Sequence, residues 1–230
     1  MQPKTAGILG GLGPETTAHF YLEIVALCQQ KKIPNRPPLL MWNIPLPYDL
    51  EKEFITTGKR IDEYLPFLIE GAKRLEKGGA DFIAIPCNSV HILIDEIRKF
   101  VQIPILSIIE ETAIFLEVEN VKKTGVLATT PTVKSRMYDG ALQSSGITTF
   151  FPETDDQNTL SDLIQQLVQN KDTKESESIL PVIMDKFTKQ GISTIILACT
   201  DLQLIVKDYP AMKIYDTMKI LAKATVKNIC

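Results

Sequence analysis

Residues 83–93 read IAIPCNSVHIL, and residues 195–205 read IILACTDLQLI. In each stretch, an apolar run typical of a buried strand is followed by a cysteine, Cys87 or Cys199, and then by a helix-like pattern. An open parallel sheet presents its functional side chains beyond the carboxyl ends of its strands. Both stretches therefore place a thiol where such a sheet carries out its chemistry.

The same alternation of short apolar runs and amphipathic helical patterns continues along the whole chain. Other strand-like runs are GILGG at 7–11, LLMWNI at 39–44 and TGVLATT at 124–130. This alternation predicts an α/β fold of mainly parallel sheets flanked by helices.

A repeat within this pattern indicates two similar lobes. Gly79 lies eight residues before Cys87, and Gly191 lies eight residues before Cys199. The opening GILGG of the chain also corresponds to GVLAT at 125–129. A single repeat of this length predicts two pseudo-symmetric lobes about a central cleft rather than a solenoid. Strand ends from both lobes would meet at that cleft, so we expect Cys87 and Cys199 to face each other across it.

The composition excludes several classes of partner. The chain has 230 residues, a net charge of −3, 44% hydrophobic and 23% charged residues, which is ordinary for a soluble globular protein. Because the chain has no excess of basic residues, neither nucleic acid nor an anionic membrane surface is an expected partner. No apolar run approaches the length of a membrane span, and the N-terminus enters a strand almost at once. We therefore expect a cytoplasmic protein.

The cysteine and histidine counts argue against a metal site or a disulfide framework. The four cysteines, Cys28, Cys87, Cys199 and Cys230, form no C-x-x-C motif, and the chain has only two histidines. A reducing compartment would also keep these thiols free. We therefore expect no metal, and we interpret Cys28 as a packing residue.

Two thiols that face one substrate carbon suit stereoinversion. One thiolate removes the Cα proton, and the opposite thiol returns a proton from the other face. The reference pKa of cysteine, about 8.5, lets one side chain act as base in one direction and as acid in the other. Each cysteine precedes a helix-like segment, whose N-terminus would favour the thiolate. Asn88, Ser89 and Thr200 are candidates to hold the substrate carboxylate.

Three segments carry a family resemblance: GILGGLGPETT (7–17), IPCNSVH (85–91) and LACTDL (197–202). They resemble the signatures of the cofactor-independent aspartate/glutamate racemase superfamily, and are most similar to its aspartate racemase branch. SIIEET (107–112) and VLATTPT (126–132) extend the resemblance over nearly the whole chain. It implies an amino-acid racemase that uses no cofactor such as pyridoxal phosphate, that acts on a small amino acid, and that forms a homodimer.

The resemblance also assigns roles to individual residues. Cys87 and Cys199 correspond to the catalytic pair. Ser89 stands where threonine is usual, Ala198 where glycine is usual, and Asp201 where glutamate is usual; none of these changes removes an acid or base. The residues that the resemblance places at the substrate are Gly11, Asn88, Ser89, Thr129, Thr132 and Thr200.

The resemblance further implies that the chain exchanges ends between lobes. The first lobe would comprise residues 1–106 plus 214–230, and the second residues 107–213.

Substrate preference is where this chain departs from the aspartate racemase pattern. The resemblance implies an arginine and a lysine that bind the side-chain carboxylate, but the arginine position holds Leu50 and the lysine position falls near Gln169. Lys171, Lys52 or Arg60 are alternative sources of positive charge. A buried carboxylate without a cationic partner is strongly disfavoured, so we expect a broader or different preference among small amino acids.

Two rival functions and one open role remain. A dinucleotide fingerprint would need a third glycine where Thr16 stands, so nucleotide binding is disfavoured. A non-enzymatic two-lobed amino-acid-binding protein fits the architecture, but leaves two strand-end thiols unexplained. His91 follows Cys87 by one helical turn, and it either supports the thiolate or caps the helix.

Overall fold

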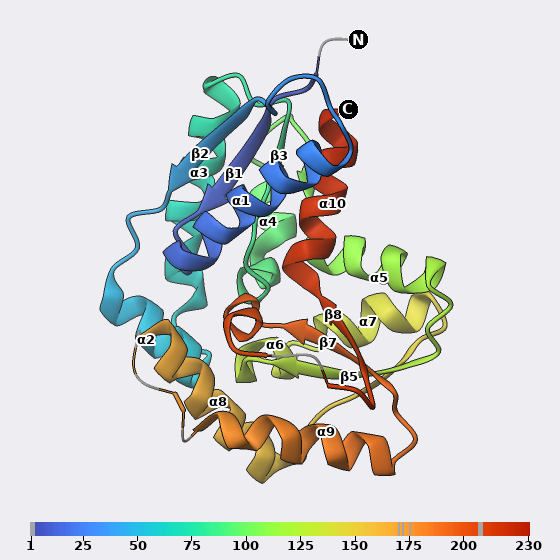
Figure 1. Cartoon of the computed structure of the whole chain (residues 1–230). Helices are drawn as coiled ribbons and strands as arrows, with labels where there is room; N and C mark the ends of the chain where they lie inside the picture. The colour runs from blue at the N-terminus through green and yellow to red at the C-terminus, as the bar shows by residue number, and fades with distance from the viewer. Residues whose placement is uncertain (1–2, 170, 172, 175, 207–208) are drawn as a thin grey trace.

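The computed structural model describes residues 3–169, 171, 173–174, 176–206 and 209–230, which form two four-stranded parallel sheets (Figure 1). The first sheet has the order β2-β1-β3-β4 and the second β6-β5-β7-β8. Their bounds are β1 Ala6–Gly10, β2 Leu39–Asn43, β3 Phe82–Ala84, β4 Ile105–Leu106, β5 Lys123–Ala128, β6 Thr148–Phe150, β7 Thr194–Ala198 and β8 Lys213–Asp216. The identical order in both sheets confirms the predicted α/β fold with two similar lobes.

The central strands are apolar because helices cover both of their faces. Successive side chains of a strand point to opposite faces, so in β1 Ile8 packs into a core shared by the two lobes and Leu9 into the outer core of the first lobe. In β5, Val126 faces the shared core and Leu127 the outer core of the second lobe. The two lobes are therefore joined through one continuous apolar layer.

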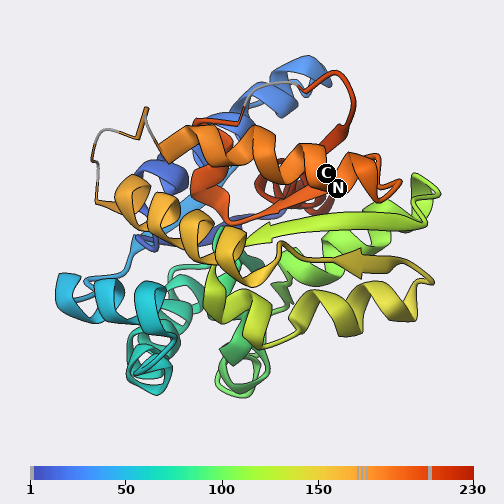
Figure 2. The same ribbon diagram turned by 90° about the horizontal axis from the view of Figure 1, so that it is seen from below.

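The helices complete these layers. The shared core receives α1 (Pro14–Gln30), α5 (Ile108–Val118), α7 (Met137–Ser144) and α10 (Thr217–Ile229). The outer core of the first lobe receives α3 (Leu65–Lys77) and α4 (Ile94–Arg98). Figure 2 shows α8 (Thr154–Val168) and α9 (Ile179–Lys189) side by side over the outer face of the second sheet. Short 3₁₀ helices cover Ile61–Tyr64, Ser89–Leu93, Ser176–Ser178 and Thr200–Leu204. No helix of the described ranges is long and apolar enough to cross a membrane.

One further helix crosses between the lobes. α2 (Tyr48–Thr57) follows β2 of the first lobe, yet it packs against α6 (Thr130–Lys134) and α8 of the second (Figure 1). Thr56 Oγ1 accepts a hydrogen bond of 2.7 Å from Gln165 Nε2 on α8. α2 therefore spans the gap between the lobes from the side of the strand ends.

The chain returns to the first lobe later than the predicted residue 214. β8 pairs in parallel with β7, with Ile196 opposite Tyr215, so the second sheet runs to Asp216. The chain leaves that sheet at the start of α10, where Asp216 caps the helix by accepting from the N–H groups of Met218 and Lys219. α10 then packs against both α1 and α5. The predicted boundary at residue 214 falls inside β8, three residues before α10 begins.

Candidate active site

Cys87 and Cys199 line one cavity between the lobes. Cys87 follows β3 and Cys199 follows β7, the corresponding strands of the two sheets. The cavity offers about 40 Å³ to water-sized molecules, which is room for only a few waters.

Six of the predicted site residues line this cavity: Cys87, Asn88, Ser89, Thr129, Cys199 and Thr200. The predicted residues Gly11, Thr132 and Lys171 are not in its lining.

Gly11 is instead needed for a close approach of two strand ends. Its φ is +85°, and a Cβ at this position would lie 2.7 Å from the backbone nitrogen of Ile44. Gly13, in the same turn, does line the cavity, and its φ of +93° also favours glycine. The glycine-rich turn was recognised in the sequence, but the residue that reaches the cavity was not.

Three buried hydroxyls join the two lobes beside Cys87. Ser89 Oγ lies 2.9 Å from Thr129 Oγ1 and 3.1 Å from Thr132 Oγ1, and the two threonine oxygens are 2.9 Å apart. Thr129 also caps α6, because its side chain accepts from the N–H of Thr132. Thr132 therefore stands behind the wall, where it supports Ser89 and Thr129.

The side chain of Asn88 connects the loops that carry the two cysteines. Its Oδ1 accepts from Tyr138 OH at 2.5 Å, and its Nδ2 donates to Thr217 Oγ1 at 3.1 Å. Thr217 in turn donates to the carbonyl of Leu197, two residues before Cys199, at 2.7 Å. These partners leave one amide hydrogen of Asn88 for a substrate carboxylate, so the residue is chiefly a link between lobes in this structure.

His91 has a structural role, which resolves the alternatives that its sequence position left open. The N–H of Ile108 donates to Nε2 at 3.1 Å, so Nδ1 carries the proton and donates to the carbonyl of Cys87 at 2.7 Å. Burial lowers the pKa of His91 to about 4, which keeps the ring neutral. The imidazole thus fixes the main chain of Cys87 against the start of α5.

Burial dominates the protonation of both catalytic candidates. It raises the pKa of Cys87 to about 12, against the opposing effect of the N–H groups of Val90 and Ser89. Burial, and then the carboxylate of Asp201, raise the pKa of Cys199 well above its usual value. The expected lowering at a helix N-terminus is present in the N–H groups but is outweighed by desolvation. Both thiols are therefore neutral at neutral pH.

Two carboxyl groups in the cavity wall were not predicted as site residues. Asp201 Oδ2 accepts from Cys199 Sγ at 3.7 Å, and its Oδ1 accepts from Thr16 Oγ1 at 2.8 Å. Glu51 of α2 also lines the cavity. Burial, followed by the charges of Asp201 and Glu15, raises the pKa of Glu51 to about 7. Only Asp201, through its place in the second cysteine motif, gave a signal in the sequence.

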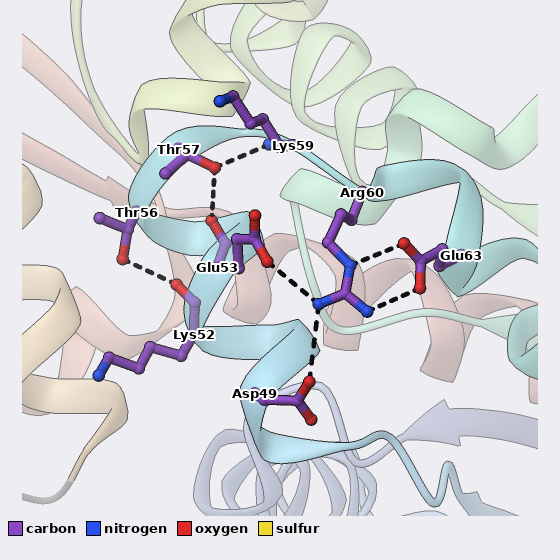
Figure 3. Close-up of polar contacts among 8 residues, drawn as sticks. All are labelled: Asp49, Lys52, Glu53, Thr56, Thr57, Lys59, Arg60 and Glu63. Carbon is purple, nitrogen blue, oxygen red and sulfur yellow. Dashed lines mark hydrogen bonds and ion pairs between the residues drawn. The ribbon is translucent and has the colours of Figure 1, made fainter.

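The residues proposed to supply a positive charge do not line the cavity. Figure 3 shows the guanidinium of Arg60 turned toward Glu63, at 2.7 and 2.8 Å, and Glu53, at 3.0 Å. Lys171 is exposed, and Lys52 lines a groove outside the cavity. No lysine or arginine of the described residues is in the cavity lining. Nor do the described residues include a group of three or more His, Cys, Asp or Glu side chains that could hold a metal ion.

Known proteins resemble this chain over nearly its whole length. Broad specificity amino-acid racemase RacX of Bacillus subtilis is 30% identical over 228 residues, which cover 96% of each chain. The structure of Picrophilus torridus aspartate racemase superposes with a TM-score of 0.82 at 26% identity, covering 98% of this chain and 94% of that one. An aspartate racemase homologue from Pyrococcus horikoshii OT3 gives 0.79 at 27% identity, covering 97% and 98%.

The model of the Asp/Glu/hydantoin racemase family matches residues 9–225. This match includes both cysteine motifs and confirms the resemblance drawn from the three signature segments. The chain therefore belongs to the Asp/Glu/hydantoin racemase family.

Proposed function

We propose that this racemase inverts the Cα of an amino acid without pyridoxal phosphate, by a two-base mechanism in which Cys87 and Cys199 act from opposite faces. The observation that supports it is that two thiols, at corresponding strand ends of two lobes, line one cavity. A packing role alone does not require the two thiols to share a cavity.

In the proposed reaction, one cysteine acts as a thiolate and the other as a thiol. The thiolate takes the proton from Cα, which breaks the C–H bond and forms an S–H bond. The electron pair left on Cα is delocalised into the substrate carboxylate. The second thiol then gives its proton to the opposite face of Cα and becomes the thiolate. One S–H bond forms and one breaks, so the step balances without a redox partner.

The environment of the thiols supports this assignment. Desolvation by burial makes a thiolate a stronger base than it is in water, which helps because an amino-acid Cα–H is a very weak acid. The backbone N–H groups of Ser89 and Asp201 stabilise the thiolate form of Cys87 and Cys199 respectively. The hydroxyls of Ser89, Thr129 and Thr200 in the wall are donors for the carboxylate as its charge grows.

The substrate that we propose is a small amino acid, with a preference that is not restricted to aspartate. Two of the relatives are named for aspartate and one for broad specificity. The lack of a described lysine or arginine in the cavity wall supports the broader preference.

The test is exchange of Cα hydrogen with deuterium from solvent, over a panel of D- and L-amino acids with no cofactor added. We expect exchange and racemisation to survive exhaustive chelation and treatment with a carbonyl reagent. The alternative, a two-lobed binding protein, predicts tight binding of an amino acid without any exchange. Exchange that requires added pyridoxal phosphate would contradict the proposal.

A further inference from the structure

Glu51 lies at the junction of two hollows. It lines the cavity that contains the cysteines, and it also lines an outer groove formed by α2 and α8. Ile55 and Val168 belong to both hollows as well. A substrate whose Cα lies between the thiols can therefore extend its side chain past Ile55 and Val168 toward the carboxyl group of Glu51.

Much of the wall near Glu51 is apolar. Phe54, Ile55, Ile164 and Val168 contribute hydrocarbon surface, and Glu51 contributes the charge. An aliphatic stem with a cationic end matches such a wall, because the stem is buried against carbon and the cation meets a carboxylate.

Nothing in the described residues already neutralises Glu51. No ion pair or side-chain hydrogen bond of Glu51 is found there, whereas Glu53 and Glu63 hold Arg60 on another side of α2 (Figure 3). The charged groups that raise the pKa of Glu51 are Asp201 after β7 and Glu15 of α1, both acidic. Lys52 lines the outer groove as well, but no ion pair between it and Glu51 is found among the described residues. A second carboxylate would be repelled at this position, and a cation would be attracted.

We propose that Glu51 is the side-chain recognition residue of this racemase, and that it selects amino acids with a cationic side chain, such as lysine and ornithine, over aspartate and glutamate. The inference rests on the proposed function, which it extends to a substrate class. The raised pKa of Glu51, about 7, agrees with a half-buried carboxyl group that has no cation bound to it. A bound ammonium group would restore its ionised form.

The experiment compares L-lysine, L-norleucine and L-aspartate at pH 8. Norleucine has the stem of lysine without the terminal amine, so the ratio of kcat/KM for lysine to that for norleucine isolates the charge contact. We expect the wild type to prefer lysine to both, and Glu51→Gln to lower that ratio about tenfold to a hundredfold, as the loss of a charge-assisted hydrogen bond would. Glutamine keeps the size of the side chain, so the variant should fold.

Glu53→Gln is the matched control, because it removes a carboxylate of the same helix that is bound to Arg60. It should leave the lysine-to-norleucine ratio unchanged. A ligand-induced rise in Tm provides a second measurement that does not depend on turnover: lysine should stabilise the wild type and the control more than Glu51→Gln.

The outcomes separate the two proposals. A wild type that prefers aspartate, or an equal lysine-to-norleucine ratio in the wild type and Glu51→Gln, would overturn the role of Glu51 while leaving the racemase reaction intact. Lysine binding that depends on Glu51 without any Cα exchange would support the recognition site and contradict the racemase reaction. Neither exchange nor stabilisation by lysine would overturn both.

Discussion

The loops that carry Cys87 and Cys199 have the same backbone arrangement but different side chains beside the sulfur. Each cysteine follows the corresponding strand of its sheet, and each sulfur is faced by the N–H groups of the residues two and three positions later. Two positions after Cys87 stands Ser89, whose hydroxyl bonds to Thr129. Two positions after Cys199 stands Asp201, whose carboxylate accepts from the thiol itself. The repeat preserves the backbone and varies the charge beside the sulfur.

This difference gives the two thiols different resting states. A carboxylate 3.7 Å from Cys199 Sγ disfavours a second negative charge, so Cys199 is held as the thiol. Asp201 and Glu51 also raise the pKa of Cys87, but burial and the N–H of Val90 act on it more strongly, and no carboxylate accepts a hydrogen bond from this thiol. We therefore expect Cys87 to be the easier of the two to ionise. In the free enzyme Cys87 is therefore expected to act as the base and Cys199 as the acid.

The largest effect should come from removing either thiol. Cys87→Ser and Cys199→Ser should each reduce kcat for racemisation about 10³-fold, because a hydroxyl is a far weaker acid than a thiol and supplies no base at neutral pH. The losses should be comparable despite the asymmetry, since every turnover uses both groups. Racemisation assays from each enantiomer measure this.

Cys230→Ser provides the matched control, because that thiol is exposed at the last residue of the chain. It should behave as the wild type. Near-normal turnover of Cys199→Ser in both directions would mean that the second loop is not catalytic.

A smaller effect should follow from cutting the link between the two loops. Thr217→Val removes the hydroxyl that joins Asn88 to the carbonyl of Leu197 and leaves both groups buried without this partner. We expect the free energy of unfolding to fall by about 1–3 kcal/mol and kcat to decrease, because the loops lose their mutual alignment. Denaturant titration and steady-state kinetics measure the two effects.

Thr225→Val on the same helix is the comparison variant. Its hydroxyl is equally buried, but it bonds only to the carbonyl of Leu221 within α10. It should cost less stability and leave kcat unchanged. Equal effects of the two variants on kcat would contradict the claim that the link through Asn88 aligns the two loops for catalysis.

The smallest effect concerns the difference in reactivity between the two thiols, which follows from the carboxylate of Asp201 beside Cys199. Because the thiolate is the nucleophile, iodoacetamide should modify Cys87 before Cys199, and the rate at Cys87 should rise about tenfold per pH unit below its pKa of about 12. Asp201→Asn removes the carboxylate and should speed the reaction at Cys199 about tenfold. Because Asp201 also raises the pKa of Cys87, the reaction there should speed up too, but by less, so that the two rates converge. Peptide mass spectrometry resolves the two sites.

Asp162→Asn, at an exposed position of α8 in the same lobe, should leave both rates unchanged. Faster modification of Cys199 than of Cys87 in the wild type would reverse the assignment of base and acid.

Local sequence patterns were sufficient to predict the two strand–turn units that carry the cysteines, but not the contacts between the lobes. The apolar runs before Cys87 and Cys199, and the glycines eight residues earlier, encode two similar strand–turn units within a few residues. The hydrogen bond from Asn88 to Thr217 joins residues 129 positions apart, and that from Thr16 to Asp201 joins residues 185 apart. Such pairs depend on how the two lobes pack together, and the hydrophobic periodicity of the sequence contains no information about that packing.

Glu51 illustrates the same limit. Its helix follows β2 of the first lobe, and nothing in PLPYDLEKEF indicates that the helix crosses to α6 and α8. The crossing turns Glu51 toward the cavity, whereas the sequence suggested Lys52 or Arg60 of the same region as the charged residue. Residues in the cysteine motifs were found because their neighbours in sequence are also their neighbours in space.

The most direct test of the two-base mechanism is the position of the label after a single enantiomer reacts in deuterium oxide. With a substrate identified from the panel, the product formed at early times should carry deuterium at Cα, while the remaining substrate should stay unlabelled, in both directions. This follows because the proton given to the product comes from the opposite thiol, which has exchanged with solvent. Product that retains its original hydrogen, or label that enters the unreacted substrate as fast as the product, would show that one group serves both faces and would contradict the two-thiol mechanism.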